Sequence, residues 1–152
     1  MILDRLNTFA DNVALSTGGT GRQVVGDQID LRLTASNLGA GRPLYVVIAV
    51  TQTFTSGGAA TVDFEVVSDA TAALATDGSS TRHLTTGARA LAGLTAGTIL
   101  LSVALPQDVT YERFLGVVAN VGTAALTAGR IDAFLTYGPP DGAWRSYADA
   151  SN

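Results

Sequence analysis

Asp63 and Glu65 are the two acidic side chains whose spacing could support catalysis. The segment from Val62 to Val66 alternates apolar and acidic residues, which predicts a strand with one solvated face. Residues two positions apart on a strand share a face and lie about 7 Å apart. Glycosidases use two carboxylates separated by roughly 5 to 9.5 Å, so this spacing is compatible with glycoside hydrolysis. Alternating polar residues are nevertheless typical of any solvent-facing strand, and we interpret the pair as surface residues.

Three other groups of residues could also do chemistry, and each has a simpler interpretation. Asp27, Asp30 and Asp77 could bind calcium, but no segment has the DxDxDG spacing of a calcium loop, so Asp27 and Asp77 are interpreted as turn residues. His83 is the sole histidine, and the chain has no GxSxG motif to supply a nucleophile, which favours a surface or interface position. The glycine run at residues 16–22 has no lysine and is interpreted as a connection. We therefore predict no catalytic, cofactor or metal site, and a protein that is not an enzyme.

The composition excludes further classes of protein. The 152 residues include no lysine and no cysteine, which removes the Walker A lysine, thiol nucleophiles and cysteine-ligated zinc or iron–sulfur sites. The net charge of −4 and nine scattered arginines argue against nucleic-acid binding, which needs clustered positive charge. No apolar run approaches the roughly 18 residues of a membrane span, and the acid at position 4 argues against a signal peptide. We expect neither nucleic acid nor a membrane among the partners.

The elements that position these residues are predicted to be strands. Glutamate and lysine, which favour exposed helices, number two and zero, whereas the chain has nineteen threonines. Short strands separated by frequent turn residues predict an all-β fold, an antiparallel sandwich or barrel, over residues 23–139. The seven or eight predicted strands include residues 28–34, 43–54, 62–65, 82–86, 98–106, 114–122 and 130–138.

Residues 1–22 are predicted to form an N-terminal arm outside this framework. Leu3, Leu6 and Phe9 recur there at near-helical spacing, but Asn and Asp residues interrupt the pattern. A short helix and an extended segment therefore both remain open.

Residues 140–152 are predicted to form a short C-terminal tail. The tail contains Trp144 and Tyr147, two aromatic residues that could stack on a sugar. Because they lie in a terminal segment, we interpret them as anchors onto the domain or onto a partner.

Two predicted strands are apolar on both faces. They contain the segments Leu44 to Val50 and Leu115 to Val121. Strands of this kind are central in a sheet or covered by another subunit, so the low charged content of 14% favours burial beyond one monomer.

The order of these segments resembles that of the capsid cement, or decoration, proteins of tailed bacteriophages of the Bordetella-phage type. Each segment is common by itself, and the specificity lies in their order within a chain of this length. The segments are MILD (1–4), FADNVAL (9–15), GDQIDL (26–31), GRPLYVVIAV (41–50), GGAATVDFEVVSD (57–69), LAGLTAGTIL (91–100), LP (105–106), YERFLGVVANVG (111–122) and LTAGRIDAFLTYGP (126–139).

The resemblance implies a jelly-roll sandwich that binds the outside of an icosahedral shell as a homo-oligomer, either a dimer or a trimer. It implies that the partner is the major capsid protein of the same phage and that neither catalysis nor a cofactor is involved. The protein would be made in the host cytoplasm and end on the outer surface of the virion.

The residues expected to contact the capsid or a second subunit are the apolar and aromatic side chains of the two ends, Leu3, Leu6, Phe9, Trp144 and Tyr147. An alternative remains open at this point. A carbohydrate-binding sandwich of a phage surface or tail would have the same fold class and would use Trp144 and Tyr147 as its stacking platform.

Overall fold

The chain folds almost entirely into strands. A computed structural model describes residues 5–15, 19–32, 35–36, 38 and 41–138. Two short 3-10 helices, η1 (Arg5–Asn7) and η2 (Leu91–Gly93), accompany the strands. The strands are β1 (Thr8–Ala14), β2 (Gly21–Asp30), β3 (Ala35–Ser36), β4 (Tyr45–Ser56), β5 (Thr61–Asp69), β6 (Thr81–Thr85), β7 (Arg89–Ala90), β8 (Ile99–Ala104), β9 (Thr110–Tyr111), β10 (Phe114–Gly122) and β11 (Leu126–Thr136).

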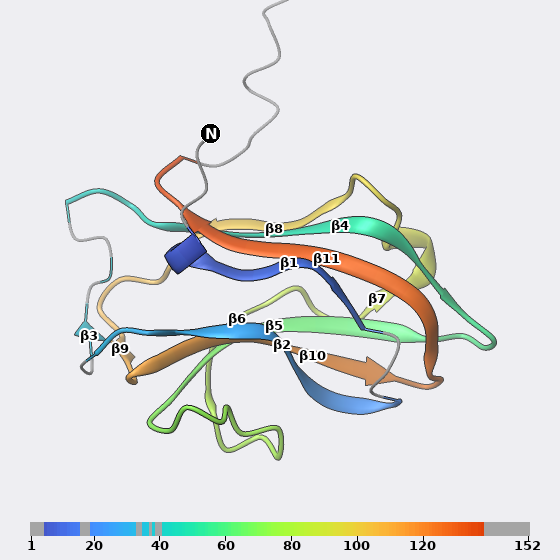
Figure 1. The fold of residues 1–152 in the computed structure, drawn as a ribbon, viewed down its shortest axis with the longest axis horizontal. Coiled ribbons are helices and arrows are strands. Elements are labelled where there is room, and N and C mark those ends of the chain that lie inside the picture. Colours follow the sequence, from blue (N-terminus) through green and yellow to red (C-terminus); the bar gives the residue numbers. More distant parts are fainter. Residues whose placement is uncertain (1–4, 16–18, 33–34, 37, 39–40, 139–152) are drawn as a thin grey trace, which may run out of the picture.

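Eight strands in two runs of four, together with the short β7, form two antiparallel sheets that pack face to face (Figure 1). One sheet has the order β1-β11-β4-β8, and the other has the order β2-β10-β5-β6, with β7 also pairing with β5. The first of these eight strands thus pairs with the last, and the second pairs with the next to last. This is the strand order of a jelly roll, in which two Greek keys wrap around one core. The prediction of an all-β, jelly-roll-like sandwich is confirmed.

The central strands are β4, between β11 and β8, and β10, between β2 and β5. Alternate side chains of both strands point into the core, among them Ile48, Phe54, Leu115 and Val117, none of which is more than 2% exposed. Phe54 meets Phe64 of β5 edge to face across the sandwich, with 6.2 Å between ring centroids. The central positions agree with the prediction from the two-faced apolar segments.

Residues 70–80 connect β5 to β6 and lie against the outer face of the β2-β10-β5-β6 sheet (Figure 1). Leu74 in this connection is 5% exposed and packs on Val67 and Val118, whose side chains point away from the main core. Gly116 provides the room for it, because a Cβ atom at that position would lie 2.3 Å from Cδ1 of Leu74. The connection therefore adds a small second core outside the sandwich.

This covering corrects one prediction and removes one argument for another. The alternation of β5 predicts a solvated outer face, but Glu65 and Val67 on that face are buried. Burial beyond one monomer no longer follows from the two-faced apolar strands, because Val118 of β10 lies under the connection and Val47 of β4 is 1% exposed beside Phe134 of β11. The apolar outer faces of the central strands are thus largely covered within one chain. The homo-oligomer stays a prediction.

The N-terminal segment differs from the predicted separate arm, because residues 8–14 form β1 at the edge of a sheet and β2 begins at Gly21. β1 pairs with β11, but two register shifts interrupt the ladder and Asn12 has a φ of 52°. Such bulges break the alternation by which a strand is recognised in sequence. The predicted strand at residues 28–34 likewise ends early, since Arg32 has a φ of 69° and its N–H donates to Oδ1 of Asp30 at 2.7 Å.

Candidate interaction surface

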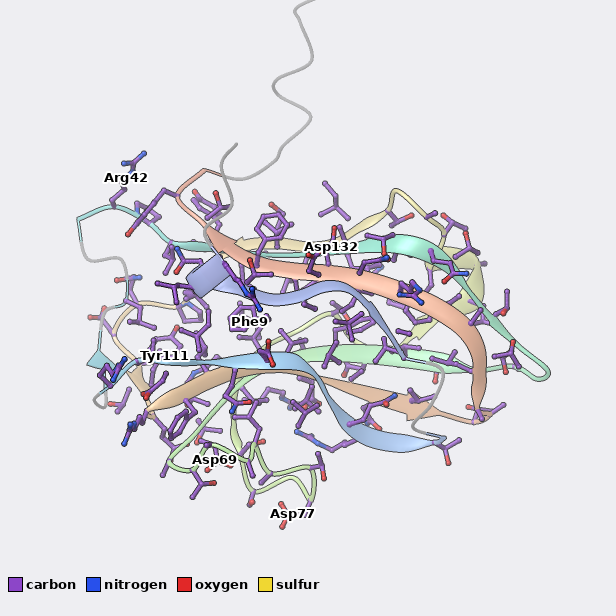
Figure 2. All side chains as sticks on the ribbon, viewed as in Figure 1. Phe9, Arg42, Asp69, Asp77, Tyr111 and Asp132 are labelled. Atoms are coloured by element: carbon purple, nitrogen blue, oxygen red, sulfur yellow. The ribbon has the colours of Figure 1, made fainter. Side chains whose placement is uncertain are left out.

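The structure describes two of the five residues that we predict to make contacts. Leu6 lies in η1 and is 78% exposed, so its side chain is at the surface. Phe9 lies in β1 and is 1% exposed, within the core (Figure 2). Because a side chain packed in the core does not reach a partner, the structure does not support Phe9 as a contact residue. Leu3, Trp144 and Tyr147 lie outside the described residues.

A groove of about 1200 Å³ runs along the edge strands β1 and β2. Two of its carboxylates are held by other groups. Asp30 accepts two hydrogen bonds of 2.9 Å from the guanidinium group of Arg113, which lowers the pKa of Asp30 to about 2. Asp132 accepts a hydrogen bond of 2.7 Å from the main-chain N–H of Asn12. The charged residues along the groove are Arg5, Asp11, Asp27, Asp30, Arg32 and Asp132.

The described residues hold neither a metal-binding cluster nor a membrane-spanning helix. Across the described part of the chain, no three His, Cys, Asp or Glu side chains gather closely enough to hold a metal ion. Residues 5–138, apart from their undescribed gaps, include no helix with the length and apolar character needed to cross a membrane.

Asp63 and Glu65 share the outer face of β5, as predicted, but neighbouring strands engage both. Glu65 is 2% exposed, with Nη2 of Arg22 2.8 Å from its Oε2 and Nη1 of Arg82 3.2 Å from its Oε1. Asp63 accepts a hydrogen bond of 2.7 Å from the hydroxyl of Thr85. A general acid must reach a substrate, whereas Glu65 is buried against two guanidinium groups. The pair therefore links β2, β5 and β6 and argues against the glycosidase interpretation.

His83 of β6 is half buried in a polar cluster. Its Nε2 lies 2.8 Å from Oγ of Ser68, and that oxygen also accepts a hydrogen bond of 3.1 Å from the N–H of Glu112. The imidazole packs on the ring of Tyr111 with 4.2 Å between centroids, and burial raises the pKa of Tyr111 to about 12. Ser68 is 0% exposed, so a substrate cannot reach its hydroxyl. We interpret this Ser–His pair as part of the fold.

Protonation of His83 is expected to destabilise the protein. Burial lowers the pKa of His83 below its usual 6.5, so the unfolded chain binds the proton more tightly than the folded one. The contribution to stability is therefore complete above pH 6.5 and is lost as the pH falls through the lower pKa of the folded state. Urea unfolding of the unaltered protein and of His83→Gln, measured from pH 7 down to about pH 5, should show a smaller loss in the variant. Equal losses would contradict this role of His83.

Exposed large apolar side chains occur at positions that sequence reasoning did not single out. Ile99 and Val103 of β8 are 46% and 44% exposed, and Tyr137, just after β11, is 55% exposed. The guanidinium carbon of Arg42 lies 5.0 Å from the centroid of the Tyr137 ring, a cation–π geometry. The apolar run at residues 98–106 predicts a strand, but only the long-range pairing places that strand at the end of a sheet.

The strand order defines a jelly-roll sandwich, a fold that viral capsid proteins and lectins share. The chain belongs to the Bbp16 family, whose family model matches residues 13–135. The match begins within β1 and ends within β11, so it includes strands from both sheets. Bbp16 is a Bordetella phage protein family, which confirms the phage part of the resemblance. No curated protein matches the chain.

Proposed function

We propose that this protein is a capsid cement protein, which binds the outer surface of a phage head as a homo-oligomer and holds neighbouring major capsid subunits together. The observation that carries this proposal is membership of a Bordetella phage family over residues 13–135. The jelly roll supports it, because this fold recurs in proteins that build viral shells.

The chemistry of the described residues also favours a role in contact. The buried carboxylate of Glu65 is bound to two arginines, and His83 is bonded to a buried serine, so both groups serve the fold. The net charge of −4 suits a position on the outside of the shell, away from packaged DNA. The carbohydrate-binding alternative depends on Trp144 and Tyr147, which lie outside the described residues.

Multiplicity explains how a small protein would stabilise a large shell. Each copy buries a modest area against the capsid subunits beneath it. When copies are joined in an oligomer, release of one contact leaves the others in place, so the effective affinity exceeds that of a single contact. A shell under internal pressure must then lose many contacts at once before it opens.

Binding to shells tests this proposal. The purified protein is mixed with bare heads of the phage that encodes it, and bound protein is measured after sedimentation. We expect saturable binding, and a several-fold loss of affinity for Leu6→Ser, because an exposed apolar contact is removed without disturbing the core. Unchanged thermal unfolding of the variant is the control for folding. Failure of the unaltered protein to bind at any concentration would overturn the proposal, whereas unchanged binding of Leu6→Ser would remove only that residue from the contact.

A further inference from the structure

Among the edge strands of the two sheets, β1, β2 and β6 carry features that oppose pairing with another strand. β1 has two register shifts and a residue with positive φ, Asn12. β2 has positive φ at Gly26 and carries Arg22, Asp27 and Asp30. β6 carries Arg82, which is bound to Glu65. Bulges and charges are among the means by which natural sheets keep their edges from recruiting strands.

β8 is the exception among these edges. It ends the β1-β11-β4-β8 sheet, and its sequence ILLSVA has no charge and no proline. No charged residue occurs between Arg89 and Asp108, so the uncharged stretch extends well beyond the strand on both sides. The one irregularity of its pairing with β4 lies at Leu100, and residues 101–104 continue the ladder regularly. Ile99 and Val103 leave nearly half of their surfaces exposed along this edge.

We propose that β8 receives a strand from a different polypeptide, an extended and uncharged apolar segment that adds to the β1-β11-β4-β8 sheet. Such strand addition gains affinity from main-chain hydrogen bonds and specificity from alternate side chains. The inference rests on the proposed function, which makes a segment of the major capsid subunit the donor. An uncharged donor is required because a charge opposite Ile99 or Val103 would lose its hydration against apolar surface.

A second copy of β8 fits this edge less well. Residues that lie opposite each other in an antiparallel pair must point to the same face of the sheet. Ile99 pairs with Ala49 and points outward, whereas Val103 pairs with Val46 and points to the core side. Every self-pairing register that keeps the faces matched places Ile99 or Val103 opposite a residue outside β8. A strand of different sequence has no such restriction and can cover both side chains.

Hydrogen exchange on the full-length protein, free and bound to bare heads, tests strand addition directly. We expect the main-chain amides of residues 99–104 that face away from β4 to exchange at least about tenfold more slowly in the bound protein. The edge amides of β6, which lies outside the β1–β2 groove, serve as the internal reference and should change little. Bound protein in which the β8 amides exchange as fast as in the free protein would overturn the inference and leave the cement role standing.

Edge-blocking substitutions give a second readout. Val103→Lys replaces an apolar side chain of the edge strand β8 with a charged one that points inward, which prevents pairing with another strand. Binding to heads should weaken at least about tenfold. Val103→Thr keeps a branched side chain without charge and should bind within about threefold of the unaltered protein. Thr81→Lys introduces the same charge at an exposed position of β6, away from the β1–β2 groove, and controls for general electrostatic effects. Thermal unfolding checks that each variant folds.

The remaining outcomes separate the sources of a covering strand. Equal binding of Val103→Lys and the unaltered protein would overturn the inference. Protection of the β8 amides in the free protein would also overturn it. Protection at all concentrations would indicate that another part of the same chain covers β8, and protection only at high concentration would indicate self-pairing. Absence of any binding to heads would overturn the cement role and this inference with it.

Discussion

Gly26→Ala is expected to lower the free energy of unfolding by about 3 kcal/mol or more, although the position is exposed and most surface substitutions cost far less. Gly26 has a φ of +67°, and a Cβ atom there would lie 2.0 Å from the carbonyl oxygen of Phe9. That oxygen belongs to the main chain of β1, so no side-chain rotation relieves the clash. The two sheets would have to separate at this edge, which would disturb the burial of Phe9. Denaturant unfolding followed by circular dichroism measures the loss.

Gly87→Ala is the matched control for this variant. Gly87 has the same φ of +67°, but a Cβ atom there would meet nothing within 4 Å. It should cost only the conformational penalty of a left-handed alanine, about 1 to 2 kcal/mol. Similar losses for the two variants would show that β1 and β2 do not approach each other as closely as described.

Glu65→Gln is expected to cost about 3 kcal/mol, because it breaks a buried ion pair and leaves the charge of its partner uncompensated. Glu65 is 2% exposed, and the side chain of Arg22, 2.8 Å away, is 20% exposed. The amide keeps the size of the carboxylate, so packing changes little and the loss reports on charge. Replacing both partners, in Arg22→Leu with Glu65→Leu, should recover much of the stability, since no buried charge then remains. Urea unfolding of the single and double variants measures the difference.

Asp30→Asn provides the comparison at the surface. Asp30 and Arg113 form a bidentate pair at 2.9 Å, but the pair is more exposed and solvent screens it. Its loss should therefore be much smaller than that of Glu65→Gln. Equal effects of the two substitutions would contradict the buried character of the Glu65 cluster.

The central strands could be predicted from sequence because their signals are local. Residues 114–122 are predicted as a strand and form β10 with those bounds. Continuous apolar runs that end at Gly or Pro need no knowledge of the neighbouring strands, and the number and spacing of such runs favour a sandwich.

Features that depend on contacts distant in sequence could not be predicted. The bulges of β1 are defined by its pairing with β11, which the sequence of β1 alone does not show. Phe9 is therefore predicted to lie in an arm, whereas the structure places it in the core. Glu65 alternates like a surface residue, yet Leu74 and its connection cover the sheet on which it lies. The exposed edge of β8 follows from the order of strands, which no single segment encodes.

The candidate contact residues were likewise predictable only in part from local sequence. Leu6 and Phe9 are predicted as contact residues from the same spacing, yet Leu6 lies at the surface and Phe9 lies in the core. The role of Leu6 in binding remains a prediction, as do those of Leu3, Trp144 and Tyr147. Ile99 and Val103 carry no distinguishing signal in sequence, since each lies in an apolar run like those of the central strands.

The temperature at which phage heads release their DNA tests the cement role most directly. DNA-filled heads that lack the protein are heated alone, with the purified protein, and with Val103→Lys as the edge-blocked comparison. If the protein joins capsid subunits, its addition raises the release temperature in a saturable way, and the variant raises it only at higher concentration. Release at the same temperature with and without saturating, bound protein would contradict the claim that this protein stabilises the shell.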